Sequence, residues 1–214
     1  MEFSKVLRSR RSIRAFLPDP VPEETIREIL DDAHWAPSWA NAQDWEVFVV
    51  TGDALGRVKA ALKAKVESGE DSNPDIPLPL MGSWPEEFLS RMTYRRPSPE
   101  AAPAPPQRAG LWEVYNAPCL LLFTIDERLA PAYGCFDSGM IVDDVCLAAA
   151  DRGLGTCIMA MLVRWPDALR EVVPAPGRLF VIGVALGTPD LEAAVNTGER
   201  KRVDLDEIVH WVSD

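Results

Sequence analysis

Hydrophobic residues recur in the first third of the chain in patterns that predict alternating helices and strands. Apolar positions at helical spacing predict an amphipathic helix from Pro22 to Ala36, with Pro22 in its first turn. The β-branched and aromatic run Glu46–Thr51 predicts a strand. Asp53 is then expected to cap a helix that continues to about Val66.

The second half of the chain repeats this alternation. The continuous apolar run Cys119–Ile125 predicts a buried strand, and the stretch Phe136–Asp151, apolar almost all round, predicts a core helix. Further strands are expected at 156–159 and 179–185, with a short helix at 166–173 between them. Interleaved helices and strands of this kind predict an α+β fold, an α/β sandwich.

The pattern dissolves between about Ser68 and Arg108 into Pro, Ser, Glu and Ala, with a short helix expected at 86–92. The prolines of 97–106 can continue neither a helix nor a central strand. We therefore expect a single domain over residues 1–214 with an insertion or lid at about 68–108. A disordered surface loop and a functional lid both fit this composition.

The net charge of the chain and the lack of long apolar runs exclude some classes of binding partner. A formal net charge of −11 opposes nucleic-acid binding, which needs a basic footprint. The first residues lack the apolar stretch of a signal peptide, and no apolar run is long enough to span a bilayer. We expect a cytoplasmic protein that acts on small molecules and binds neither nucleic acid nor membrane.

Few side chains offer reactivity. The four cysteines have no Cys-x-x-Cys spacing and no nearby histidine, so buried thiols are expected and no metal site. The sequence holds only two histidines, His34 and His210. An enzyme with this composition would draw its reactivity from a cofactor.

Two basic clusters stand out against the acidic background. Arg10-Arg11-Ser12-Ile13-Arg14 places guanidinium groups beside a hydroxyl, a set that suits a phosphate, although a solvated helix end gives the same pattern. A second cluster, Arg200-Lys201-Arg202, lies near the other terminus. Alone it would be a surface feature, but if the clusters met they would form a strong anion site.

Two further segments bear on the site. The loop Pro37–Trp45 carries amides and indoles that could bind the edge and face of a heteroaromatic ring, or could form a polar turn pinned by Trp45. The stretch Gly153–Met161 superficially resembles the glycine fingerprint of dinucleotide-binding proteins. It lacks the third glycine and precedes a strand instead of opening a helix, so a Rossmann fold is not predicted. A helix cap followed by a buried strand explains those glycines.

Taken in order, these segments resemble the nitroreductase family of FMN enzymes along nearly the whole chain except about 68–108. The resemblance rests on five stretches: Arg10–Arg14, Trp35-Ala36-Pro37-Ser38, the trio Asn41, Gln43 and Trp45, Gly153–Thr156, and the basic residues near the end. It implies a mostly antiparallel sheet flanked by helices and an intertwined homodimer with FMN sites at the interface. Residues 81–85 and 183–196 look most like the nitrobenzoate-reductase-like branch.

The resemblance also implies roles for individual residues. The phosphate and ribityl end would be held by Arg10, Arg11, Ser12, Arg200 and Arg202, and Arg14 would lie near the N1 and O2 edge of the flavin. The partner subunit would contribute Pro37, Ser38, Trp39, Ala40 and Asn41, with Gln43 supporting that loop. Backbone amides around Ala160 and Met161 would face N5, and Ile158 and Met159 would also contact the cofactor.

The activity implied is ping-pong reduction of nitroaromatic or quinone-type acceptors by NAD(P)H through FMN, with no catalytic side chain. Trp39, Trp84 and Phe88 would line the acceptor pocket, the last two from a closing arm. Trp39 replaces a usually small residue and Asp44 a usual proline, which bears on substrate range. Specialised flavin chemistry on the same fold (dehalogenation, flavin fragmentation or peptide oxidation) and a flavin-free binding or dimerisation protein are the alternatives.

Overall fold

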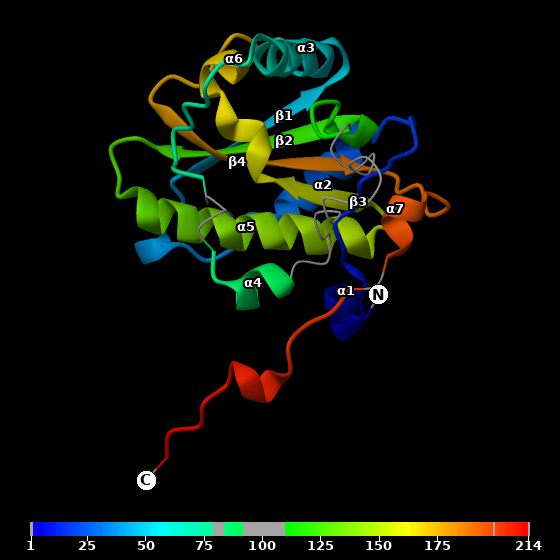
Figure 1. Ribbon diagram of the computed structural model, residues 1–214, viewed down its shortest axis with the longest axis vertical. Coiled ribbons are helices and arrows are strands. Elements are labelled where there is room, and N and C mark those ends of the chain that lie inside the picture. Colours follow the sequence, from blue (N-terminus) through cyan, green and yellow to red (C-terminus); the bar gives the residue numbers. More distant parts are fainter. Residues whose placement is uncertain (1, 79–83, 92–109, 199, 214) are drawn as a thin grey trace.

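A four-stranded sheet forms the centre of the molecule in the computed structural model, which describes residues 2–78, 84–91, 110–198 and 200–213 (Figure 1). The strand order is β1-β2-β4-β3, and every neighbouring pair is antiparallel. The prediction of a mostly antiparallel sheet flanked by helices is therefore confirmed. The strands are β1 (Trp45–Thr51), β2 (Cys119–Asp126), β3 (Gly155–Met159) and β4 (Arg178–Gly187).

Helices cover both faces of this sheet (Figure 1). Helices α3 (Gly52–Ser68) and α6 (Pro166–Arg170) pack on one face, and α2 (Glu23–Ala33) and α5 (Pro131–Asp151) lie on the other. The side chains of strand β2 alternate between two apolar clusters, one on each face of the sheet. Because both faces are covered, the strand is buried along almost its whole length. This explains why its sequence reads as a continuous apolar run.

The core helix α5 begins at Pro131, five positions before the expected Phe136. Pro131 fixes the φ angle of the first turn, a signal that the apolar pattern alone did not use. The helix ends as predicted at Asp151, with Gly153 in the left-handed conformation at φ 75°. Its outer face carries exposed aromatic side chains, Tyr133 at 53% and Phe136 at 66%.

Other boundaries differ from the predictions for local reasons. Helix α2 starts after Pro22 and stops at Ala33, because Pro37 disfavours the helical conformation at the residue before it. Asp53 does not cap α3: the capping position is Thr51, and no side-chain cap bond forms there. Helix α6 stops at Arg170 instead of Val173, since Pro174 follows.

The start of the predicted insertion is fastened to the body of the protein. Asp75 accepts a hydrogen bond from the backbone N–H of Phe180 (2.8 Å) and pairs with Arg170 (2.7 Å). The indole N–H of Trp165 donates to the carbonyl groups of residues 70 and 71. Short helix α4 (Glu86–Ser90) confirms the helix expected at 86–92, whereas the proline-rich stretch 97–106 lies outside the described residues.

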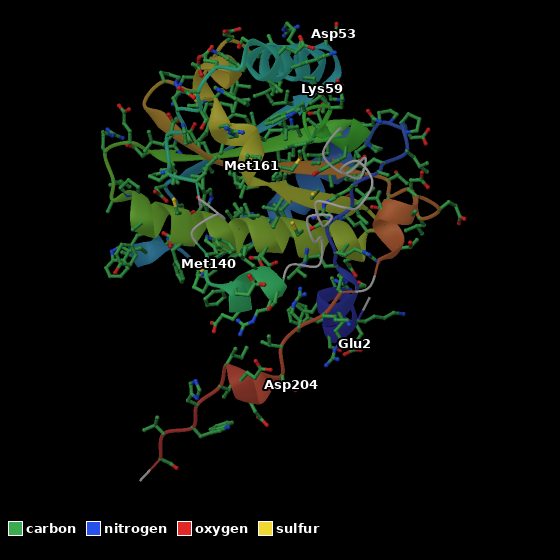
Figure 2. The ribbon with its side chains drawn as sticks, viewed as in Figure 1. Glu2, Asp53, Lys59, Met140, Met161 and Asp204 are labelled. Atoms are coloured by element: carbon green, nitrogen blue, oxygen red, sulfur yellow. The ribbon has the colours of Figure 1, made fainter. Side chains whose placement is uncertain are left out.

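The N-terminal segment and the region of helix α7 lie together near α5. Helix α1 (Phe3–Ser9) leads into a bridge between Ser12 and Thr156 of the edge strand β3. Helix α7 (Ala194–Thr197) packs nearby, and the chain from residue 200 to 213 then extends away from the body (Figure 1). Asp204 lies on this arm in Figure 2. The arm exposes Leu205, Ile208, Trp211 and Val212.

The helices that the structure describes include none with the length and apolar character needed to cross a membrane.

Candidate functional site

The two basic clusters come together in the fold. The guanidinium group of Arg200 donates hydrogen bonds to the backbone carbonyls of Arg8 and Arg10. Arg11 in turn donates to the carbonyl of Gly198 at 2.6 Å. Two segments at opposite ends of the sequence thus form one basic surface. The sequence predicted a strong anion site if these two clusters met.

The charge of this surface is not neutralised by carboxylates. Burial, and then the neighbouring charges of Arg11, Arg10 and Arg202, lower the pKa of Arg200. The Nε atom of Arg11 is buried and has no hydrogen-bond partner within the described part of the chain. Within the same part, no carboxylate forms an ion pair with any of these four arginines. A clustered positive charge with a spare donor suits a bound phosphate.

Strand β3 and helix α7 fix the arginine segment in place. The backbone N–H of Ile13 donates to the carbonyl of Thr156 at 2.8 Å. Gly155 is needed there, because a Cβ atom at that position would come within 2.7 Å of the Ile13 side chain. The glycine of the rejected dinucleotide motif therefore has a packing role beside the site.

Asn196 is a residue that the sequence analysis did not assign. Its buried side chain accepts a hydrogen bond from the backbone N–H of Arg14 (2.8 Å) and donates to the carbonyl of Ala15 (2.9 Å). A third bond, to the carbonyl of Asp190, fixes the amide from the other side. A single asparagine in a polar stretch carries no sequence signal for this role.

The loop from Pro37 to Gln43 has an unusual backbone. Ala40, Asn41 and Gln43 adopt positive φ angles of 49°, 59° and 48° although none is glycine. Ser38 Oγ accepts a hydrogen bond from the N–H of Gln43, and the Gln43 side chain donates to the carbonyl of Asn41, each at 3.0 Å. Gln43 is thus bonded to Ser38 and Asn41 within the loop, and non-glycine residues at positive φ angles mark a strained segment.

Helix α5 holds the same loop from outside, through two residues that sequence reasoning missed. The backbone N–H of Trp39 donates to Asp137 Oδ2 at 2.8 Å. The ring centres of Trp39 and Tyr133 lie 4.7 Å apart with their planes tilted by 51°. A usable signal existed for Asp137, because it is a lone acid in the apolar first half of α5.

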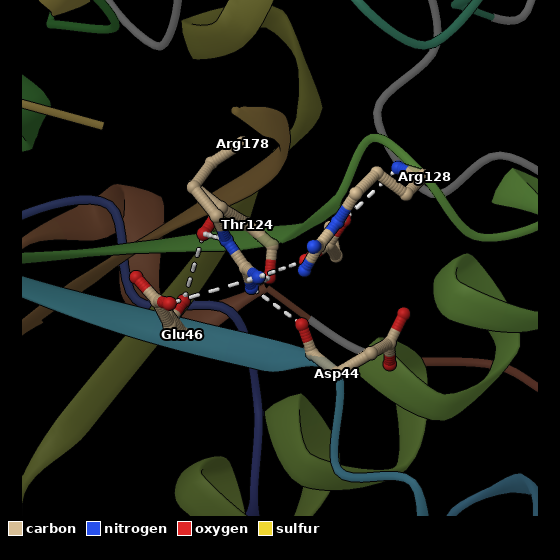
Figure 3. A network of polar contacts seen from close by, with 6 residues as sticks. Asp44, Glu46, Thr124, Arg128 and Arg178 are labelled. Carbon is tan, nitrogen blue, oxygen red and sulfur yellow. Dashed lines mark hydrogen bonds and ion pairs between the residues drawn. The ribbon is translucent and has the colours of Figure 1, made fainter. Parts of the chain in front are cut away.

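The residue after the loop is anchored to the sheet, as Figure 3 shows. The buried Arg178 donates to the carbonyl of Asp44 and to Thr124, and its guanidinium lies 3.6 Å from Glu46 and 3.8 Å from Asp126. Burial, followed by the charge of Asp137, raises the pKa of the Asp44 carboxyl. Its Oδ1 is buried without a hydrogen-bond partner among the described residues.

Residues 158–161 run from β3 into the 3-10 helix Ala160–Arg164 on the exposed edge of the sheet. Ile158 and Met161 are partly exposed, at 40% and 39%, whereas Met159 is buried. Met161 lies just beyond the end of β3 in Figure 2. The Ser12–Ile13 segment pairs with the outer edge of β3 at Thr156, so a ligand that contacts this edge would do so beyond Thr156, at residues 158–161.

One chain does not bring the arginine surface and the Trp39 loop together. The loop contacts Tyr133 and Asp137 in the first part of α5, whereas Arg10 lies near enough to Cys146 to lower that thiol's pKa against the raising effect of burial. Asp137 and Cys146 are about 14 Å apart along the helix axis, at 1.5 Å per residue. On one chain the arginine surface and the Trp39 loop are therefore two separate surfaces.

The aromatic residues predicted to close the acceptor pocket lie on or beside α4. Trp84 and Phe88 are 38% and 42% exposed, and the guanidinium of Arg91 lies 5.1 Å from the centre of the Phe88 ring. Arg91 also lies 3.9 Å from Glu207 of the C-terminal arm. Within the described residues neither aromatic ring contacts Trp39, and the adjoining 79–83 and 92–109 lie outside them.

Comparison with known proteins decides the family. The model of the nitroreductase family matches residues 7–188. The chain belongs to the nitroreductase family. This nitroreductase is 32% identical over 232 residues to a chloronitrobenzene nitroreductase of Comamonas testosteroni, covering 98% of the chain and 96% of that protein. It is 30% identical over 221 residues to a 4-nitrobenzoate reductase of Pseudomonas putida, covering 99% and 96%.

Solved structures give the same result for the fold. The nitroreductase superposes on the FMN-dependent nitroreductase NfnB of Mycobacterium smegmatis, solved in complex with NADPH, with a TM-score of 0.85. The two are 27% identical, and the match covers 98% of this chain and 97% of that one. The family match ends at residue 188, so Arg200 and Arg202 lie beyond it. Arg200 joins the arginine surface through its hydrogen bonds, and the charge of Arg202 is among those that lower the pKa of Arg200.

No group of three or more His, Cys, Asp or Glu side chains in the described part of this nitroreductase could hold a metal ion.

Proposed function

We propose that this nitroreductase is an FMN-dependent enzyme that uses NAD(P)H to reduce nitroaromatic or quinone-type acceptors. The observation that carries the proposal is the meeting of Arg10 and Arg11 with Arg200 around an unpartnered guanidinium nitrogen. Two relatives that are 30% identical to this chain are named nitrobenzene nitroreductase and 4-nitrobenzoate reductase. The superposed NfnB is an FMN-dependent nitroreductase solved in complex with NADPH. Single-domain organisation of 1–214 and a cytoplasmic location remain part of the proposal.

The residues present fit the phosphate end of FMN. Arg11 has a buried donor to offer, and Arg10, Arg200 and Arg202 surround it with positive charge. The Ser12 hydroxyl adds a neutral donor on the same segment. Arg14, held by Asn196, would place its charge near the N1 and O2 edge, and the backbone of Ile158–Met161 would lie toward N5.

Bound FMN would supply the chemistry, accepting hydride from the reduced nicotinamide and passing electrons to the acceptor. The chain's own share is to bind, orient and exclude water. Its thiols are poor nucleophiles, because burial raises the pKa of Cys119 to about 12 and that of Cys157 to about 11. A mechanism without a protein nucleophile is consistent with this.

We further propose that the active form is an intertwined homodimer. On one chain the Trp39 loop and the arginine surface lie against different parts of α5, and in the dimer that we propose the Trp39 loop of one subunit would lie over the arginine surface of the other. The apolar outer face of α5 and the exposed side chains of the arm 200–213 offer the surface that such a dimer needs. Trp39 would then face the acceptor, with Trp84 and Phe88 as candidate pocket residues.

The test is a visible absorption spectrum of the purified protein, mass analysis of any compound released on denaturation, and addition of NAD(P)H. We expect released FMN and bleaching. A paired comparison of Arg11→Ala with Arg27→Ala checks the site, since Arg27 is an exposed arginine paired with Glu23 on α2. FMN retention should fall only in Arg11→Ala. FMN without bleaching would favour specialised flavin chemistry, and no flavin even after added FMN would contradict the proposal.

A further inference from the structure

Trp39 is exposed yet fixed in place. Its side chain is 64% exposed, and a large apolar ring of that kind on a loop normally samples several rotamers. Here the backbone N–H is bonded to Asp137, and the indole packs on the ring of Tyr133. Both the main chain and the side chain of one exposed residue are therefore held by helix α5.

The two residues that support Trp39 lie on one face of α5 and therefore act together. Tyr133 and Asp137 are four positions apart and so share one face of the helix. Gly134, between them, lies so close to the sheet and to the loop base that a Cβ atom would come within 2.8 Å of Asp44 Oδ2 and 3.0 Å of Ile125 Cδ1. This turn of α5 consequently cannot shift without moving the loop.

The loop is also held in a conformation that it would not choose by itself. The positive φ angles of Ala40 and Asn41 directly follow Trp39, and residues other than glycine adopt this region only at an energetic cost. Such strain persists where the surrounding contacts impose it. Both contacts that this strained loop makes with α5 end on Trp39, which indicates that the position of the indole matters.

The chemistry of the exposed surface identifies a ligand class. Trp39 and the 53% exposed Tyr133 are electron-rich rings, and the acid that contacts this loop from α5, Asp137, is buried and already accepts a hydrogen bond. The indole of Trp39 therefore favours stacking with a flat, electron-poor aromatic ring over an aliphatic acceptor. We propose that Tyr133 is a positioning residue that sets the orientation of Trp39 and thereby the selection of aromatic acceptors; this rests on the proposed function.

The test separates acceptor binding from flavin chemistry. Steady-state kinetics with 4-nitrobenzoate are compared with kinetics with ferricyanide, an acceptor that has no aromatic ring, at saturating NAD(P)H. The variants are Tyr133→Leu, Tyr133→Phe, Trp39→Leu and the double variant Trp39→Leu/Tyr133→Leu. Aromatic pairs contribute about 0.5–1.5 kcal/mol beyond burial, so the KM for 4-nitrobenzoate should rise about 3- to 10-fold in Tyr133→Leu. Tyr133→Phe, which keeps the ring, should stay within about twofold of wild type.

The double variant identifies the route of the effect. If Tyr133 acts through Trp39, Tyr133→Leu adds little to the KM for 4-nitrobenzoate once Trp39 is leucine, and Tyr133→Leu alone leaves the ferricyanide kinetics unchanged. Additive effects on KM, an unchanged KM in Tyr133→Leu, or an equal loss with both acceptors would each overturn the inference. Wild-type protein that holds no FMN, or is not bleached by NAD(P)H, would instead overturn the proposed function and this inference with it.

Discussion

The guanidinium group of Arg200 donates a hydrogen bond to the backbone carbonyl of Arg10, a residue 190 positions earlier in the chain. The contact joins the C-terminal segment to the turn after α1 and concentrates positive charge on a protein with a net charge of −11. Because like charges repel at short range, such a cluster is stable only if something offsets it, and a phosphate does so directly.

Replacement of Arg200 should therefore weaken FMN binding. Hydrogen bonds to charged groups contribute about 1.5–3 kcal/mol, so Arg200→Ala should raise the FMN dissociation constant by roughly 10- to 100-fold. Arg200→Lys keeps the charge but cannot bond both carbonyl groups as arginine does, so its FMN dissociation constant should lie between those of wild type and Arg200→Ala. The measurement is quenching of flavin fluorescence on titration of apoprotein with FMN.

Lys63→Ala serves as the control for loss of one positive charge, because Lys63 lies on α3 and its partner is Glu67. Equal affinities in the Arg200 and Lys63 variants would contradict a phosphate site at the arginine cluster.

The hydrophobic pattern was sufficient to predict all four strands and the core helix, because β2 and α5 are buried enough for their composition to report their environment. Element ends were less predictable where a proline outside the apolar pattern set the limit, as at Pro131 and Pro174. The whole topology follows from the resemblance more than from the pattern, since pairing β2 with β4 spans a long sequence separation.

The site was predictable only in part, for a physical reason. Charged and amide side chains suited to a ligand can be recognised in a sequence by their residue type, so both arginine clusters could be named from the sequence. Asn196 holds its partners through backbone groups of distant segments, and nothing in the sequence around it indicates those partners. Asp137 also bonds a distant backbone group, and its only sequence signal is that it is a lone acid in the apolar first half of α5. Tyr133 was hidden for the same reason, as one aromatic residue at a helix start.

Two glycines should respond to alanine in opposite directions. A Cβ atom on Gly183 would lie 2.7 Å from Leu162 Cδ2 and 3.3 Å from Leu120 Cδ1, inside the packed core. Gly183→Ala should therefore lower the free energy of unfolding by about 1–3 kcal/mol. Gly56 lies exposed within α3 with open space around it, so Gly56→Ala should raise stability by about 0.5–1 kcal/mol.

Urea unfolding followed by tryptophan fluorescence measures both glycine variants on the same scale. A neutral or stabilising Gly183→Ala would mean that the interface between β4 and the 3-10 helix is looser than the contacts indicate.

The four thiols should differ sharply in reactivity. Burial raises the pKa of Cys119 to about 12 and that of Cys157 to about 11, and burial also raises the pKa of Cys146. Cys135 is only half-buried, although burial and the charge of Asp44 raise its pKa as well. Near neutral pH a maleimide should therefore label Cys135 slowly and the other three only after unfolding.

Intact-mass analysis of native and denatured samples counts the labelled thiols, and Cys135→Ser should abolish the native label. Rapid labelling of Cys119 or Cys157 in the native protein would contradict their burial.

Asp44 should make stability depend on pH in a direction opposite to that of an ion-paired acid. Burial first, and then Asp137, raise its pKa from 3.8, so the folded state favours the protonated carboxyl. Its contribution is fully present below the unfolded pKa and is lost as pH rises through the higher folded pKa. Asp44→Asn, which cannot ionise, should therefore match wild type near pH 3 and become more stable than wild type toward pH 7.

The difference in unfolding free energy between the Asp44 variant and wild type, taken from urea titrations between about pH 3 and pH 8, isolates this carboxyl from all others. Asp19→Asn, at an exposed position, controls for the loss of one negative charge. A difference that shrinks with rising pH would mean that ionised Asp44 is stabilised in the fold. In that case the unpartnered Oδ1 beside the Trp39 loop would have to find a donor that the described residues do not provide.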